Sequence, residues 1–441
     1  MNNSDEPALI FAPHNDDEIL ATGGIIQRCR EAGSTAKVVI VTNGDGQRRR
    51  PNFVPRLRAD FVKLGYRRQN ESLEALKYLD LEENDVYFLG YPDRGLSSMW
   101  TTNWNCDNLY YSKFTKTDHS PYDNSYTPNA PYCGSRIIED MEEILQKVKP
   151  GSVYLPHPND RHPDHWATNG LVLYALERLK AEEHHEFNDV AMLTYLVHSV
   201  RFPWPRGQFL EETLGKPENL ESLDTKWQEI ELNLGERVRK LRAIGKYRTQ
   251  NQLMRKYLIS FARATELFGI VPTLHLDNFT IYKDTHNISR DFVLNEDDEE
   301  PLISYLNPKR KSRLATLRRY PDIESVSLTK QAQGLQLDIN FFNRYRPGNE
   351  IQINFKPLSF KKEDHEARAS QLFQFRNNKL YHDGKEISQE NGYSYQYQPD
   401  SCSLSIPLEK LGYPNRLILS ITLARKGSPF ARSANRLVEL G

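Results

Sequence analysis

The 441-residue sequence lacks the long apolar run and the charge imbalance that several classes of protein require. Its first apolar run, residues 8–12, ends just before His14 and Asp16, whereas a membrane-spanning helix needs about 20 apolar residues. Lys and Arg number 58 against 59 Asp and Glu, so no net field attracts nucleic acid or an anionic membrane. We therefore expect a globular protein with no integral membrane segment and no nucleic-acid partner.

Cysteine is also scarce, with four in the chain: Cys29, Cys106, Cys133 and Cys402. None are spaced as C-x-x-C, so the sequence gives no support for a zinc knot or a thioredoxin-like motif. The first residues lack the cationic and apolar regions of a secretory signal. We expect a cytoplasmic location. Cys106 and Cys133 flank one loop and could pair, but in that compartment we expect reduced thiols.

The order of sequence patterns predicts two kinds of architecture along the chain. Up to about residue 200, short apolar runs alternate with helical patterns, which is typical of a parallel sheet with helices on both faces. After Pro272 the runs become short and are separated by turn residues, which predicts an all-β sandwich. The expected strands of the first part are 8–12, 37–42, 86–89, 152–155 and 190–197, and its expected helices are 17–32, 54–79, 136–148 and 163–180.

One long insertion interrupts this order. Residues 93–135 are rich in Trp, Tyr, Asn, Ser and Pro, and this aromatic content favours an ordered segment. It could cover the strand ends and stack on a sugar, or it could pack onto its own domain. Helices over 238–246 and 253–267 are expected to close the first domain, so the predicted domains are 1–270 and 271–441.

Two clusters of His and Asp follow predicted strands of the parallel sheet. Residues 13–18 follow the first strand, and residues 156–165 follow the fourth. Acidic residues are ordinary at a helix N-terminus, because the free amides and the helix dipole stabilise negative charge. That does not explain imidazoles beside adjacent carboxylates, where a cation would offset the repulsion. Since parallel strands end at one edge of a sheet, the clusters predict a metal site.

The expected metal ligands are His14, Asp17 and His165. The first two come from one strand-to-helix turn, and the third comes from the start of another helix. Two imidazoles and one carboxylate are typical of catalytic zinc, which keeps a position for water. The same set suits non-haem iron(II), so both metals stay open, at one ion per chain.

The two motifs resemble those of the PIG-L family, also called LmbE-like, of metal-dependent deacetylases. The family's His-Pro-Asp-Asp-Glu motif appears here as residues 14–18, with Asn15 in place of proline. Its His-Pro-Asp-His motif appears as residues 162–165. The resemblance covers about residues 7–270 and implies a Rossmann-like open sheet.

Two smaller matches support this resemblance. Residues 68–71, Arg-Gln-Asn-Glu, resemble the family's Arg-x-x-Glu on the second helix. Residues 240–250 resemble a further family helix, with Tyr247 and Thr249 in place of His and Ser.

The resemblance also implies roles for the motif residues. His14, Asp17 and His165 become the metal ligands, Asp16 the general base and His162 the acid. Physical chemistry agrees, because zinc lowers the pKa of its water to about 7 and a carboxylate can then take the proton. Asp164 is placed to orient an imidazole, with helix capping as the alternative.

Three further residues are expected to contact the substrate. Arg68 resembles the family's substrate-binding arginine, with a solvated helix charge as the alternative. Asp93 follows the third strand and could hold a sugar hydroxyl. His198 follows the fifth strand and reaches the same edge if that strand is parallel.

The sequence therefore predicts a zinc-dependent hydrolase whose metal-bound water removes an N-acetyl or other N-acyl group from an amino sugar or its glycoside. Two alternatives remain open. One is a non-haem iron oxygenase with the same ligands. The other is a carbohydrate-binding protein with a structural metal, in which the insertion and the sandwich bind glycan.

Overall fold

The computed structural model divides into two compact units, Met1–Pro272 and Thr273–Gly441. No helix in its described part combines the length and apolar character needed to cross a membrane. The described residues are 6–46, 57–182, 184–221, 223–276, 279–282, 323–341, 348–358, 370–377, 379–387, 392–425 and 427–440.

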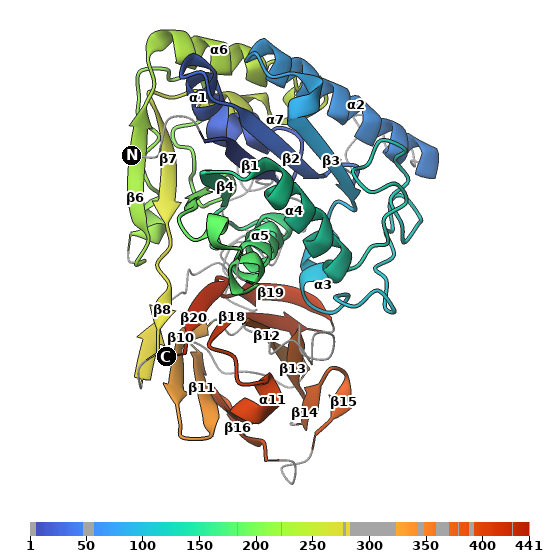
Figure 1. Cartoon of the computed structure of the whole chain (residues 1–441), viewed down its shortest axis with the longest axis vertical. Coiled ribbons are helices and arrows are strands. Elements are labelled where there is room, and N and C mark those ends of the chain that lie inside the picture. The colour runs from blue at the N-terminus through green and yellow to red at the C-terminus, as the bar shows by residue number, and fades with distance from the viewer. Residues whose placement is uncertain are drawn as a thin grey trace, which may run out of the picture. The chain divides into compact units, whose positions relative to one another are not determined.

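The first unit is built on a seven-stranded sheet in the order β3-β2-β1-β4-β5-β7-β6 (Figure 1). Strands β1 to β5 pair in parallel, whereas β7 runs antiparallel to β5 and β6. The strands are β1 (Ala8–Ala12), β2 (Ala36–Thr42), β3 (Val86–Tyr91), β4 (Ser152–Pro156), β5 (Ala191–Tyr195), β6 (Lys226–Glu231) and β7 (Thr265–Ile270). The predicted α/β class with a mostly parallel sheet is confirmed. The strand order reverses between β1 and β4, the place where open sheets of this kind bind ligands.

Helices cover both faces of this sheet. Helices α1, α2 and α6 pack together on one face, and α3, α4 and α5 pack together on the other (Figure 1). The helices are α1 (Asp17–Glu31), α2 (Arg58–Tyr78), α3 (Leu96–Trp100), α4 (Gly134–Val148), α5 (Pro163–Ala181), α6 (Leu234–Ile244) and α7 (Arg248–Leu258), with 3-10 turns Glu83–Asp85, His185–Phe187, Glu218–Leu220 and Ile259–Phe261. The four helices expected up to residue 180 are present as α1, α2, α4 and α5, although residues 54–56 lie outside the described residues.

The helix predicted over 253–267 is wrong in its second half. Helix α7 ends at Leu258, a 3-10 turn over Ile259–Phe261 follows, and from Thr265 the chain forms β7, which pairs with β6. This pairing joins segments that lie more than 30 residues apart in the sequence, and such long-range pairing overrides local helical preference. The helix expected over 238–246 is present as α6.

A buried ion pair holds helix α1 against α6 and β7. Lys240 Nζ donates to Glu266 Oε1 over 2.6 Å, and both side chains are fully buried. The Glu266 carboxylate also accepts hydrogen bonds from the backbone N–H groups of Gly24 (2.6 Å) and Ile25 (3.1 Å). A Cβ atom at Gly24 would lie 2.4 Å from the Leu232 side chain, so this approach requires glycine.

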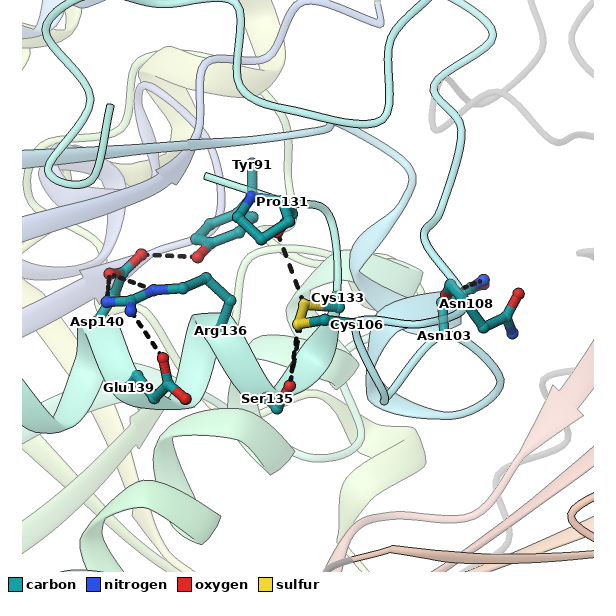
Figure 2. Close-up of a disulfide and its surroundings, with 10 residues drawn as sticks. All are labelled: Tyr91, Asn103, Cys106, Asn108, Pro131, Cys133, Ser135, Arg136, Glu139 and Asp140. Carbon is teal, nitrogen blue, oxygen red and sulfur yellow. Dashed lines mark hydrogen bonds and ion pairs between the residues drawn. A yellow bond between two sulfur atoms is a disulfide. The ribbon is translucent and has the colours of Figure 1, made fainter. Parts of the chain in front are cut away.

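The insertion over 93–135 is ordered, and a disulfide between Cys106 and Cys133 closes it (Figure 2). The expectation of reduced thiols at these two positions is therefore wrong for this structure. Backbone N–H groups of residues 134–135 donate to the carbonyl groups of residues 103–104 over 3.0 Å, and this brings the cysteine Cα atoms to 5.1 Å. That separation is usual for a disulfide. Because disulfides are rare in a reducing cytosol, the structure gives no support for the predicted cytoplasmic location.

Most aromatic side chains of the insertion are buried in the first unit. Trp100, Trp104, Tyr122 and Tyr132 are each at most 5% exposed. Trp104 packs against Trp100 and the α5 residue Tyr174. These aromatic residues therefore pack onto their own domain, which was one of the two alternatives for the insertion.

The second unit consists of two mainly antiparallel sheets, in the orders β16-β17-β11-β10-β9 and β15-β14-β13-β12-β18-β20-β8, with β19 paired to β18. Among the described strands of this second unit, only β20 and β8 pair in parallel. The elements are β8 (Leu274–His275), β9 (Phe279–Tyr282), β10 (Ile323–Lys330), β11 (Gly334–Phe341), β12 (Asn349–Leu358), β13 (Gln371–Arg376), β14 (Lys379–His382), β15 (Lys385–Glu386), β16 (Ser394–Gln398), β17 (Ser401–Pro407), α11 (Leu408–Leu411), β18 (Arg416–Arg425), β19 (Ser428–Arg432) and β20 (Arg436–Glu439). Alternate residues of both sheets, such as Ile339 and Ile421, form one apolar core. The predicted all-β region is confirmed.

The disulfide predicts the number of reactive thiols. Denatured protein kept without reductant should react at two of its four cysteines, Cys29 and Cys402, because Cys106 and Cys133 are bonded to each other. Thiol titration in guanidinium checks this, with reduced protein as the control that reacts at all four. Four reactive thiols before reduction would contradict the disulfide.

The buried ion pair predicts a large stability difference between two neighbouring positions of α6. Lys240→Met should lower the free energy of unfolding by about 3 kcal/mol, because it leaves a buried carboxylate without its cation. Arg239 pairs with Asp80 at the surface, so Arg239→Met should cost at most about 1 kcal/mol. Urea denaturation measures both. Equal losses would show that the buried pair contributes no more than the exposed one.

Candidate metal centre

The two His and Asp clusters meet at the carboxyl ends of β1 and β4, which are neighbours in the sheet. The ring centroids of His14 and His165 lie 5.3 Å apart, and those of His14 and His162 lie 4.6 Å apart. The structure thus brings together segments that are separated by about 150 residues.

Asp17 lies between the two expected imidazole ligands. Its Oδ2 atom is 3.3 Å from His14 Nδ1 and 3.0 Å from His165 Nε2. Ligand atoms held at about 2.0–2.1 Å around a tetrahedral zinc lie about 3.3 Å apart. Both ring nitrogens of His165 are buried and make no hydrogen bond of good geometry among the described residues, which leaves Nε2 free to bind an ion. These three residues therefore fit a divalent metal.

Donor atoms in three overlapping groups of the described residues lie within 4.8 Å of one another. The groups are His14, His162 and His165; Asp17, His165 and His198; and His14, Asp93 and Asp164. The expected ligand trio is divided between the first two groups, which share His165. We favour the expected trio because one Asp17 oxygen lies within 3.3 Å of both rings.

Asp164 contacts an imidazole, which agrees with the predicted orienting role rather than with helix capping. Its Oδ2 atom lies 3.4 Å from His14 Nε2. Its carboxylate also accepts hydrogen bonds from the backbone N–H groups of Arg94 (2.6 Å) and Leu96 (3.1 Å). Asp164 does not cap helix α5, because the N-cap is His162, whose Nδ1 accepts from the Asp164 N–H.

Asp16 occupies the strained turn between β1 and α1. Its φ is 125°, and its N–H donates to Glu18 Oε2 over 2.9 Å. Burial, together with the negative charges of Asp17 and Glu18, raises the pKa of Asp16, while Arg68 opposes this shift. A buried carboxylate in these surroundings binds a proton readily.

The three expected substrate residues lie at the same edge of the sheet. Arg68 is 5% exposed and donates to the Gly44 carbonyl over 2.5 Å, so the solvated-charge alternative is wrong. Asp93 accepts from the Gly46 N–H over 2.8 Å and lies 3.5 Å from His14.

His198 reaches this edge because β5 is parallel to β4. Its ring centroid is 5.2 Å from that of His162 and 4.7 Å from that of His165.

Residues of the motif over 240–250 form hydrogen bonds with the turn after β1. Tyr247 donates to Glu18 Oε1 over 2.6 Å, and Gln250 Nε2 donates to the Asn15 carbonyl. The Thr249 hydroxyl donates to Glu71 over 2.6 Å. The residues that differ from the family pattern therefore make structural hydrogen bonds here.

Sequence reasoning missed Asp160, which is fully buried beside His165. Its Oδ2 atom lies 3.2 Å from His165 Nδ1. Burial alone would raise the pKa of Asp160, but the neighbouring His165 and His198 lower it to about 2. The signal available in the sequence was its position two residues before His162, inside the second cluster.

Residues of the first unit are similar to the PIG-L family of deacetylases. The family model described as PIG-L, GlcNAc-PI de-N-acetylase, matches residues 9–176, a range that contains β2 to β4, all of β1 except Ala8, and most of α5. The expected resemblance is thus confirmed for this part of the chain.

Curated relatives match only part of the chain. The probable N-acetyl-alpha-D-glucosaminyl L-malate deacetylase 2 of Bacillus subtilis (strain 168) is 27% identical over 40% of this chain and 64% of its own length. The 1D-myo-inositol 2-acetamido-2-deoxy-alpha-D-glucopyranoside deacetylase 2 of Saccharopolyspora erythraea is 28% identical over 38% of this chain and 55% of its own length. The chain thus spans less than two thirds of these two relatives.

Among solved structures, N,N'-diacetylchitobiose deacetylase from Pyrococcus horikoshii aligns with 60% of this chain and 84% of that chain. The identity is 18% and the TM-score is 0.38.

The electrostatics of the site predict that metal binding releases protons. Burial alone would lower the pKa of both His14 and His165, but carboxylates outweigh it and raise the pKa of His14, and Asp160 and Asp17 raise that of His165 to about 10. A raised pKa favours the protonated rings when no ion is bound, whereas an ion needs their neutral forms. Zinc binding should release about two protons, and zinc affinity should rise with pH. Calorimetry in two buffers that differ in ionisation enthalpy measures the number. Binding without proton release would contradict the protonated rings.

Proposed function

We propose that the first unit is a metal-dependent deacetylase that removes the N-acetyl group of an N-acetylglucosamine derivative. One observation carries the proposal: Asp17 lies between His14 and His165, with a second buried carboxylate, Asp16, next to it in the turn. A purely structural metal would need no such second carboxylate. The PIG-L match supports the proposal, as do two relatives that are named for deacetylating glucosaminyl conjugates.

In this proposal His14, Asp17 and His165 hold one zinc ion per chain. A bound zinc ion supplies two effects, which are polarisation of the amide carbonyl and a lowered pKa, about 7, for a water molecule. The residue set also suits iron(II), so the metal is part of the test.

Asp16 and His162 are the proposed proton carriers. Asp16 in its ionised form accepts a proton from the attacking water, and burial beside the Asp17 and Glu18 charges raises its pKa and so makes it a stronger base. Nδ1 of His162 accepts a hydrogen bond from the Asp164 N–H, so Nε2 is the ring atom that can donate to the substrate. A hydrogen bond from His162 Nε2 stabilises the negative charge on the carbonyl oxygen. The departing amine then takes the proton from the same ring nitrogen. Asp164 keeps the His14 ring in place.

The remaining residues of the edge are proposed to bind the sugar. Asp93 accepts from sugar hydroxyl groups and Arg68 donates to them. The His198 ring lies beside that of His162 and contacts the same substrate. We assign the reaction to a domain over 1–270 and an accessory role to a domain over 271–441.

Two adjacent isosteric variants test the assignment of the carboxylates. Asp17→Asn should lose the metal, because it removes the charge between the two imidazoles. Asp16→Asn should keep the metal and lower the rate about 10²–10⁴-fold, the usual contribution of a general base. Metal analysis per chain and release of free amine from a panel of N-acetyl sugars and glycolipids measure these outcomes. Full metal content in Asp17→Asn, or full activity in Asp16→Asn, would overturn the assignment.

The same preparations separate the alternatives. Zinc together with amine release supports the deacetylase. Iron together with substrate-dependent oxygen consumption would indicate the oxygenase. Glycan binding that leaves the acetyl group intact in the metal-loaded protein would indicate a binding protein with a structural metal.

A further inference from the structure

The two imidazoles beside Asp17 face it with different ring nitrogens. His14 faces Asp17 with Nδ1 and has Asp164 at 3.4 Å from Nε2. His165 faces Asp17 with Nε2 and has Asp160 at 3.2 Å from Nδ1. Each ring therefore lies between Asp17 and at least one further buried carboxylate, and His14 Nε2 also has Asp93 at 3.5 Å.

The Asp160 carboxylate is fixed by backbone groups from two loops. Its Oδ1 atom accepts from the His162 N–H over 3.0 Å, in the loop after β4. Its Oδ2 atom accepts from the N–H groups of Val197 and His198, both over 2.9 Å, in the segment after β5. A carboxylate held by three backbone donors has little freedom to move, so it presents a fixed acceptor to the His165 ring.

We propose that Asp160 is the positioning residue for His165. When an ion occupies the site and the ring is neutral, the carboxylate, which lies 3.2 Å from Nδ1 in this structure, would accept the Nδ1 proton, and this selects the tautomer whose Nε2 lone pair can bind the ion beside Asp17. The same carboxylate holds the loops of His162 and His198 at one edge of the sheet. This proposal rests on the metal-binding role of His165 proposed above.

Replacement by asparagine should break this arrangement for a geometric reason. Each oxygen of Asp160 faces at least one N–H donor, so an amide NH2 group must point at a donor in either orientation. Asp160→Asn should therefore weaken zinc binding about 10–100-fold, as loss of such a carboxylate partner does at other metal sites. Asp160→Glu keeps the charge but displaces it by one methylene, and should recover part of the affinity.

A matched control separates this effect from the general loss of a buried carboxylate. Asp140 is also fully buried and accepts from Tyr91 and Arg136 (Figure 2), and it belongs to none of the donor groups of the candidate metal centre. Asp140→Asn should lower the melting temperature and leave zinc affinity unchanged. Zinc affinity is measured on the full chain by competition with a chromogenic chelator. The absorption spectrum of the cobalt-loaded protein is an independent readout of ligand geometry, and it should change only in the Asp160 variants.

A structure of the zinc-loaded wild-type chain keeps the proposal testable if Asp160→Asn does not fold. His165 should bind the ion through Nε2, with Nδ1 within hydrogen-bond distance of Asp160. Ligation through Nδ1 would overturn the proposal, as would unchanged zinc affinity and cobalt spectrum in a folded Asp160→Asn.

These outcomes separate the two proposals. If Asp160→Asn weakens zinc binding but the wild-type chain releases no amine from any substrate, the positioning role stands and the deacetylase proposal fails. If the wild-type chain deacetylates and Asp160→Asn binds zinc normally, only the positioning role fails.

Discussion

The repulsion among buried carboxylates at the β1 and β4 strand ends is the constraint on which the site depends. Asp16, Asp17, Asp160 and Asp164 are all buried there, and the histidines of the two clusters lie among them. Asp160 and Asp17 oppose the effect of burial on His165 and raise its pKa to about 10, which favours a positive charge among these carboxylates. A divalent ion would supply positive charge at the same place. The buried carboxylates therefore need a neighbouring positive charge whether or not the proposed ion is bound.

The surrounding unit holds this charged edge through further buried polar contacts. Glu18, beside the metal turn, accepts from Tyr247, and Glu71 on α2 accepts from Thr249. Both partners come from the segment before and within α7, more than 170 residues later in the chain. The Lys240–Glu266 pair also stabilises helix α1, because Glu266 accepts hydrogen bonds from the backbone of Gly24 and Ile25. The turn that carries the expected ligands is therefore fixed from several directions, as a preorganised site requires.

Some of these features were predictable from sequence because they depend on local patterns. Apolar runs alternating with helical periodicity identified β1 to β5, and short separated runs identified the second unit. Local patterns failed where long-range contacts decided the structure. β7 was expected to continue a helix, since nothing near Thr265–Ile270 announces its pairing with β6. Cys106 and Cys133 were expected to be reduced, since the hydrogen bonds that bring them together join segments 30 residues apart.

The sequence by itself determined the α/β class of the first unit, the all-β class of the second and the residue types of a metal centre, because strand and helix periodicity and the motifs over 14–18 and 162–165 are local properties. Only the tertiary structure decided which ring nitrogen of each histidine faces Asp17, and which carboxylate stands behind each ring. It also revealed Asp160, whose partners come from two loops. Those contacts depend on the parallel pairing of β1, β4 and β5, which sets the distance between strand ends and cannot be read from any one segment.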